Sequence, residues 1–331
     1  MKTKLGLGLA TLAGLLLLFG LIAYHGFGGV LRALIAVGWT GILAASLYHL
    51  VPLIFSALGW RAILRSAWRA PLVHFLWVRL VREEVGNFLP IGGELVSARV
   101  LTFHGAKAGV AGASVVVDMT VEVMTQLLFT VAGVVLLISG SHGDGPVDWL
   151  IGGLAVAAPV LLSFLVAQHW GLFKLLEDFI ERIAKKWHWV KDASVAGLHN
   201  TIKALYRDRR GIVEGSGYHM LSWILGSGEI WIALHFMGNP VSFREALILE
   251  SLTMAVRVVG FAIPAALGVQ EGGYLLAGQL LGLSPEICLA LSLVKRARDL
   301  LLGVPALAGW HFLEGRRMWH RIQHARRASK G

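Results

Sequence analysis

Six charged side chains lie deep inside two long apolar runs of the sequence. Asp118 and Glu122 are four residues apart in the run 109–139, so a helix would place them on one face. The run 286–312 carries its charges at a similar depth, at Lys295, Arg296, Arg298 and Asp299. A charge at the centre of a bilayer costs about 2.5–3.5 kcal/mol on insertion scales. These side chains must therefore face protein or water, where they can pair, carry a proton or bind a polar group.

Opposite charges at similar depth predict ion pairs between the two runs. Our hypothesis is that Asp118 and Glu122 approach Lys295 and Arg298, with Asp299 in the same intramembrane network. The sequence leaves two roles open, a structural network that joins the halves of the protein or a set of groups that serves a site. A coupling proton on Asp118, Glu122 or Glu271 is a further hypothesis.

Two segments repeat the order Gly, Pro, Glu. They read Gly86-Asn-Phe-Leu-Pro90-Ile-Gly-Gly-Glu94 and Gly260-Phe-Ala-Ile-Pro264-Ala-Ala-Leu-Gly268-Val-Gln-Glu271. Pro removes a backbone donor and Gly permits non-helical dihedrals, so a helix breaks at each segment. Freed backbone at membrane depth survives only where it lines a cavity or is buried in protein. Each segment predicts a helical hairpin beside a polar cavity, with a tolerated proline kink as the alternative.

An arginine precedes each predicted break. Arg82 lies eight residues before its Pro and Arg257 lies seven before, and a guanidinium there suits a phosphate or a carboxylate. We expect Arg79 to extend to the nearer interface instead. Glu250, seven residues before Arg257, is an alternative partner that would make this arginine structural.

The composition belongs to a membrane protein. Of 331 residues, 56% are apolar and 15% are charged, and the mean hydropathy is +0.68. Soluble domains carry about 45–50% apolar and about 25% charged residues, which excludes a soluble enzyme, a disordered chain and a fibrous protein. The net charge of +10 comes from Lys and Arg in short blocks between apolar runs, which indicates positive-inside loops rather than a nucleic-acid partner. A single cysteine, Cys288, and histidines without metal-ligand spacing predict no metal and no cofactor.

We predict an all-α polytopic integral membrane protein with about six full spans and two re-entrant helical hairpins. The spans are expected at 5–24, 39–58, 109–139, 149–170, 218–237 and 286–312. If the hairpins 73–108 and 244–284 dip in and return, every basic loop lies inside. The cytoplasmic side then holds both termini, the amphipathic stretch 171–214 and the basic tail 313–331.

The two halves, 1–140 and 141–312, read as an inverted repeat. Glu94 to Asp118 is 24 residues, and Glu271 to Lys295 is also 24. The first hairpin enters from the cytoplasm and the second from outside, which is a transporter-like architecture with its site near the midplane. A chance match of short motifs in a Gly-rich protein is the alternative.

The motif Asn87-x-x-Pro90-x-Gly-Gly-Glu94 with Arg99, the block from Pro264 through Gly268 to Glu271-Gly-Gly, and the span order resemble a known family. It is the flippase-like transmembrane domain of lysylphosphatidylglycerol synthases, and the likeness covers roughly residues 5–312. More narrowly, the chain resembles the hopanoid-biosynthesis-associated subfamily. One departure is that Pro264-Ala-Ala-Leu stands where a Gly-rich run is usual.

The resemblance implies movement of a lipid between leaflets of the bacterial inner membrane, without amino-acid transfer. It maps eight residues onto the two motifs, which with Arg82 and Arg257 complete the expected substrate-binding set: Asn87, Pro90, Glu94, Arg99, Pro264, Gly268, Glu271 and Gly272. Phospholipid, aminoacylated lipid and hopanoid-type lipid all fit. The alternatives are an intramembrane lipid-modifying enzyme with Asp118 and Glu122 as an acid–base pair, or a non-catalytic scaffold that recruits lipid-biosynthesis enzymes through 171–214.

Overall fold

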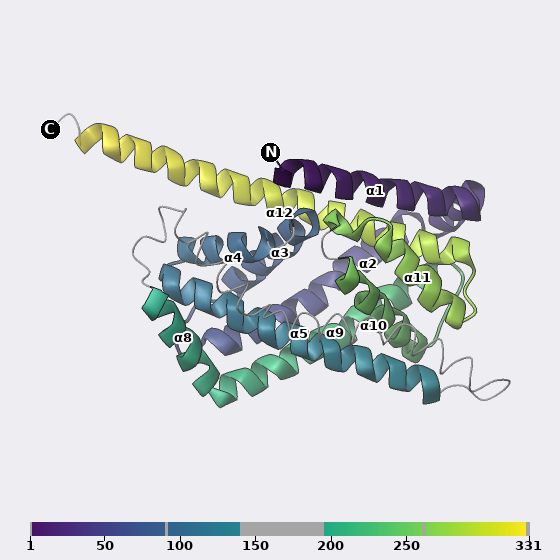
Figure 1. The fold of residues 1–331 in the computed structure, drawn as a ribbon, viewed down its shortest axis with the longest axis horizontal. Coiled ribbons are helices and arrows are strands. Elements are labelled where there is room, and N and C mark those ends of the chain that lie inside the picture. The colour runs from purple at the N-terminus through teal and green to yellow at the C-terminus, as the bar shows by residue number, and fades with distance from the viewer. Residues whose placement is uncertain (1, 90–91, 140–194, 261–262, 329–331) are drawn as a thin grey trace.

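The computed structural model describes residues 2–89, 92–139, 195–260 and 263–328, and these residues form helices and no β-strand. Figure 1 shows them as a bundle along one long axis. The elements are α1 (Lys2–His25), α2 (Phe27–Leu64), α3 (Leu72–Phe88), α4 (Gly92–Phe103), α5 (Ala108–Ser139), α8 (Val195–Arg207), α9 (Arg209–Phe236), α10 (Phe243–Val259), the short 3-10 turn η2 (Pro264–Ala266), α11 (Val269–Leu280) and α12 (Pro285–Ala328). The helical prediction is confirmed for this part of the chain.

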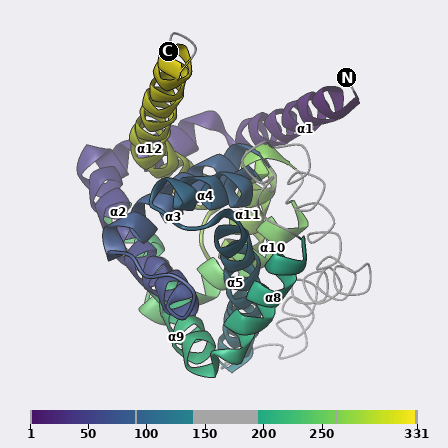
Figure 2. The ribbon, with the colours of Figure 1, turned by 90° about the vertical axis from the view of Figure 1, so that its left-hand side faces the viewer.

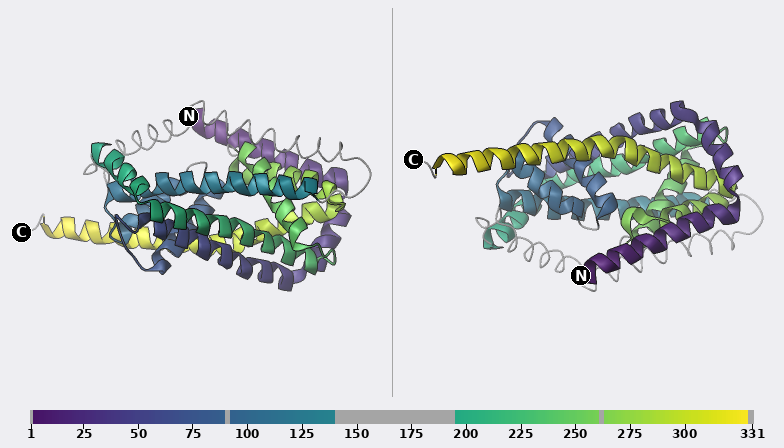
Figure 3. Two further views of the ribbon diagram at one scale, coloured as in Figure 1. Left: turned by 90° about the horizontal axis from the view of Figure 1, so that it is seen from below. Right: turned by 90° about the horizontal axis from the view of Figure 1, so that it is seen from above.

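The long helices follow the predicted apolar runs but extend beyond them. Helix α2 starts at Phe27, bends at Gly38, where φ is 59°, and continues past Pro52. Helix α12 runs on into the basic tail, and Figure 3 shows its C-terminal part projecting beyond the other described helices. Of the described helices, α2 and α5 are long and apolar enough to cross a membrane by length and composition. The total of six spans stays a prediction, and its span 149–170 lies outside the described residues.

Two helix pairs flank the predicted breaks. Helix α3 ends at Phe88 and α4 begins at Gly92, while α10 ends at Val259 and α11 begins at Val269. The partners in each pair pack together, and η2 contacts α3, so the second break lies against the first hairpin. In Figure 1 the pair α3–α4 lies toward one end of the bundle and the pair α10–α11 toward the other.

The second break is formed without the usual glycines. Ala265 and Ala266 adopt φ values of 54° and 46°, a region that non-glycine residues rarely occupy. Gly268 follows at φ 76° and caps α11. The departure at Pro264-Ala-Ala-Leu therefore preserves a break in the helix, at the cost of local backbone strain.

Two apolar cores lie toward opposite ends of the bundle. One takes in α2 up to Ala45 and α12 up to Val294, and the other takes in α2 from Ala57 and α12 at Ala306. Figure 2 shows α2 and α9 on one side of the bundle and α5 and α8 on another. The stretches of α2 and α12 between the two cores carry His49, Lys295 and Arg298, so a polar layer separates the cores at mid-length.

Candidate functional site

A cavity of about 490 Å³ occupies this polar layer. Both hairpins line it, together with α2, α5, α9 and α12. Its ionisable lining is balanced, with five cations and five carboxylates beside two histidines: Arg79, Arg82, Arg257, Lys295, Arg298, Glu83, Glu94, Glu122, Glu229, Glu250, His49 and His219. A charged lining of this kind suits a polar or charged group.

In the first half, arginines of the hairpin pair with carboxylates of the span that follows. Arg79 and Arg82 lie three residues apart on α3 and donate to Asp118 on α5 at 2.9 and 2.6 Å. Both also contact Glu122. Asp118 is fully buried and lies 2.9 Å from Nε2 of His219 on α9. The cluster ties three helices together because every buried charge has a partner.

In the second half of the chain the hairpin also pairs with the helix that follows it, but here the hairpin carries the carboxylate and the helix carries the cation. Lys295 on α12 donates to both oxygens of Glu250 on α10, at 2.8 and 3.0 Å. The hydroxyl of Tyr274 on α11 donates to Glu250 at 3.2 Å. Lys295 and Glu250 are 3% and 4% exposed, so each is shielded from water and is stabilised by its bond to the other.

The predicted pairing across the two halves is therefore wrong. No hydrogen bond or ion pair in the described structure joins Asp118 or Glu122 to Lys295 or Arg298. Each hairpin packs on the helix that follows it, as α4 does on α5 and α11 does on α12, so Asp118 and Lys295 each find an oppositely charged partner on the hairpin of their own half. All five residues of the predicted network are nevertheless engaged in ion pairs.

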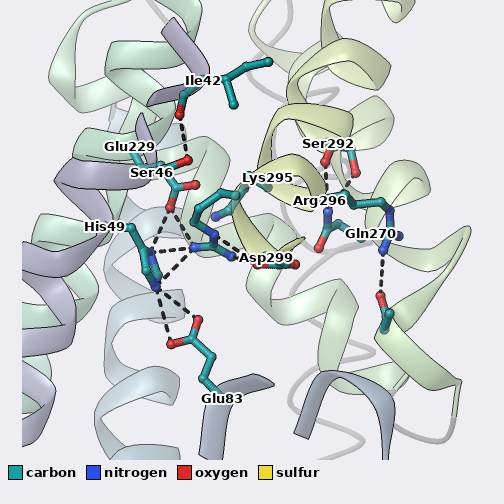
Figure 4. A network of polar contacts seen from close by, with 12 residues as sticks. Ile42, Ser46, His49, Glu83, Glu229, Gln270, Ser292, Lys295, Arg296 and Asp299 are labelled. Atoms are coloured by element: carbon teal, nitrogen blue, oxygen red, sulfur yellow. Dashed lines mark hydrogen bonds and ion pairs between the residues drawn. The ribbon is translucent and has the colours of Figure 1, made fainter. Parts of the chain in front are cut away.

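A third cluster joins α12 to α2 and α9. Arg298 donates to Glu229 at 2.9 Å and contacts its neighbour Asp299. Figure 4 shows His49 between Glu229 and Glu83, each 3.2 Å from one of its ring nitrogens. His49, Glu83 and Glu229 are members of this cluster that were not predicted from the sequence. The signal was present, because Glu229 is an acidic residue within the predicted span 218–237.

Glu271 lies in a separate buried cluster behind the second break. It is fully buried and accepts from Arg296 at 2.7 and 2.9 Å and from Ser292 at 2.7 Å. Arg296 also donates to the carbonyl of Ala265 at 3.2 Å, and Gln270 donates to Ser292 at 2.8 Å. Figure 4 shows Arg296, Ser292 and Gln270 together. These bonds hold the strained turn against α12.

The expected substrate-binding residues divide into two groups. Arg82, Asn87, Glu94 and Arg257 line the cavity, whereas Pro264, Gly268, Glu271 and Gly272 are not among its lining residues. Pro90 lies outside the described residues. Arg99 donates to Glu314 on α12 at 3.1 Å and packs over Phe103. The roles of both groups in binding stay predictions.

Two expectations about arginines are corrected. Arg79 does not extend to an interface, because it is 7% exposed and bonded to Asp118. Glu250 pairs with Lys295 rather than with Arg257. Within the described residues, Arg257 makes no hydrogen bond and no ion pair, although its side chain lines the cavity. It is a cation that a ligand can reach without breaking an existing pair.

A helical bundle with paired charges around a cavity at mid-length has the architecture of a polytopic membrane protein. The sequence profile of the lysylphosphatidylglycerol synthase TM region matches residues 5–306, so the chain belongs to this family. The family prediction is confirmed, and membership assigns the chain to a membrane and to membrane-lipid biology. Searches among curated proteins and among solved structures found no match.

Proposed function

We propose that this chain is a flippase, which moves a polar-headed lipid between the leaflets of the bacterial inner membrane. The observation that carries this proposal is the charged cavity between two hairpins, at mid-length in a bundle of membrane helices. A head group would cross within the cavity while its apolar tails stay in lipid. Each hairpin would be re-entrant, and the exchanged signs of the Arg82–Asp118 and Glu250–Lys295 pairs support an inverted repeat.

The orientation follows from the basic helix ends. Arg65, at the end of α2, pairs with Asp208 at the start of α9, so these ends lie together. Figure 1 shows α8 and the C-terminal end of α12 at one end of the bundle. These segments carry much of the Lys and Arg of the chain. We therefore assign this end, and both termini, to the cytoplasm by the positive-inside rule.

Arg257 is the proposed anchor for the head group. Arg79, Arg82, Lys295 and Arg298 are held by carboxylates, whereas no carboxylate among the described residues holds Arg257. A guanidinium binds phosphate with two parallel hydrogen bonds, and the bonds strengthen where water is scarce. Phospholipids, aminoacylated lipids and phosphate- or carboxylate-bearing hopanoid-type lipids share this chemistry.

The two alternatives have less support. An enzyme that uses Asp118 and Glu122 as an acid–base pair needs a free carboxyl group, but both are held by Arg79 and Arg82. A scaffold needs a free docking face on 171–214. In its described part, Leu205 packs α8 against the core that includes α5, and no observation on the exposed side chains of α8 points to a protein partner. Transport without covalent chemistry is therefore our proposal.

The test is to identify the lipid that stays bound through purification in mild detergent. Mass spectrometry would compare wild type with Arg257→Gln and with Arg32→Gln, which changes an exposed arginine on α2 away from the cavity. We expect one lipid class to be enriched in wild type and in Arg32→Gln and lost in Arg257→Gln. Bulk membrane lipid in all three would contradict a specific site, and a new lipid species in cells that carry the gene would favour the enzyme.

A further inference from the structure

Glu84 on α3 differs from the other buried carboxylates of the polar layer. It is 3% exposed, and its carboxyl group lies against Gly303 of α12. Within the described structure it makes no hydrogen bond and no ion pair. Every other acidic residue that is at least nine-tenths buried in this part of the chain accepts a bond from a cation: Asp118, Glu229, Glu250 and Glu271.

The charges around Glu84 do not compensate a second negative charge. Its own helix contributes Glu83, α12 contributes Arg298 and Asp299, and α2 contributes His49. Arg298 is already bonded to Asp299 and to Glu229. A carboxylate in this position would face like charges without a partner of its own, and a buried group in that state takes up a proton instead.

Among the residues that the structure describes, the remaining neighbours of α3 do not supply a cation to Glu84. On α4, Glu94 faces Arg82 at 3.6 Å and Arg99 donates to Glu314. The turn η2 consists of Pro264, Ala265 and Ala266 and has no ionisable side chain. The neutral acid is therefore the form that fits the pocket against Gly303.

We propose that Glu84 is a proton-binding site that couples proton uptake to the binding of an anionic head group. The inference rests on the proposed lipid transport, and it adds a proton gradient as the energy source for that transport. Arg298 also lines the cavity, so an anionic head group held by Arg257 offsets part of the positive charge of Arg298. Less positive charge then acts on Glu84, and its carboxyl group holds the proton more tightly. By linkage, a proton on Glu84 strengthens binding of the anion by the same factor.

The experiment measures the affinity of the purified full chain for phosphatidylglycerol between pH 6 and pH 9. For one coupled proton, wild type binds up to about tenfold more tightly for each unit of decrease in pH. Glu84→Gln copies the neutral acid, so its affinity should stay at the acidic wild-type level throughout. Glu245→Gln is the matched control, because Gln also serves in the capping box at the start of α10, and it should keep the pH dependence.

A second measurement does not depend on the folding of a variant. Lipid added to weakly buffered wild-type protein at the alkaline end of this pH range, where the free protein has released the proton from Glu84, should cause uptake of as much as one proton per lipid bound, read with a pH indicator. Lipid binding with no proton uptake and with pH-independent affinity would overturn the coupling and leave the transport proposal standing. No specific binding of lipid at any pH would overturn both.

Discussion

Nη1 of Arg82 lies 2.6 Å from Oδ2 of Asp118, and this buried contact fixes the first hairpin to the span that follows it. The ring of Trp60 packs against the same guanidinium, 5.5 Å from centroid to Cζ. The arrangement positions the hairpin without using Glu94, which lies 3.6 Å from Arg82 and remains on the cavity wall.

Removing the charge of Asp118 should destabilise the protein. Asp118→Asn leaves two buried arginines and His219 short of their shared partner, and removal of one member of a buried pair costs about 3–5 kcal/mol. Thermal unfolding in detergent should show a clear loss of stability relative to wild type. Glu94→Gln, which removes only a 3.6 Å contact, serves as the comparison and should change stability little.

Lys295 and Arg257 should respond oppositely to neutralisation. Lys295→Met leaves Glu250 buried without a cation, so we expect a loss of about 3–5 kcal/mol. Arg257→Met breaks no pair in the described structure, so the protein should fold with wild-type stability and lose lipid binding. Unfolding temperature and bound lipid, measured on the same samples, check both. An unstable Arg257→Met would show that this arginine has a structural role.

Gly93 and Gly86 of the first hairpin should respond differently to an added methyl group. A Cβ on Gly93 would collide with the carbonyl oxygen of Arg82, whereas a Cβ on Gly86 would meet no atom within 4 Å. Backbone cannot give way as a side chain can, so Gly93→Ala should cost about 1–3 kcal/mol. Gly86→Ala should be neutral in the same unfolding assay, and equal effects of the two substitutions would contradict the packing of α4 on α3.

The contact between α2 and α9 should produce a response to acid. Hydrogen bonds from Arg65, at 3.2 Å, and from the amide of Gly211, at 3.0 Å, hold the pKa of Asp208 below its usual range. The folded state therefore favours the carboxylate, and this stabilisation is complete above about pH 4 and is lost as the pH falls through the folded-state pKa. Wild type should lose more stability than Asp208→Asn between pH 5 and pH 3. Parallel curves would rule the contribution out.

The sequence predicts the parts of this fold that depend on local chemistry. Pro and Gly place the helix breaks near Pro90 and Pro264, because a missing donor and a free dihedral act on the chain itself. Burial of Asp118 and Lys295 follows from their place in apolar runs. Their partners depend on which helices pack together, and the sequence gives no direct measure of that. Equal depth predicts a pair between Asp118 and Lys295, whereas in the structure each of them pairs with a residue of its own hairpin, Arg79 and Glu250.

The roles of His49 and His219 also depend on which helices pack together, so the sequence does not predict them. Neither His49 nor His219 has a metal-ligand spacing in the sequence, so their sequence positions assign them no site. Their importance comes from distant contacts, with Glu229 and Asp118, that join α2, α5 and α9. An ionisable residue within an apolar run is the sequence signal that could identify such a position. Only the packing of the helices shows which of these residues line the same cavity.

The most direct measurement is lipid exchange between leaflets in reconstituted vesicles. A lipid with a reporter on its head group is exposed to a membrane-impermeant quencher, and the protected fraction reports movement. Vesicles with wild type or Arg32→Gln should lose protection, while Arg257→Gln should slow the loss by about tenfold or more, the effect of one charge-assisted contact. If the inner-leaflet lipid stays protected from the quencher in vesicles with folded wild-type protein, at acidic and at neutral pH, the flippase proposal is contradicted.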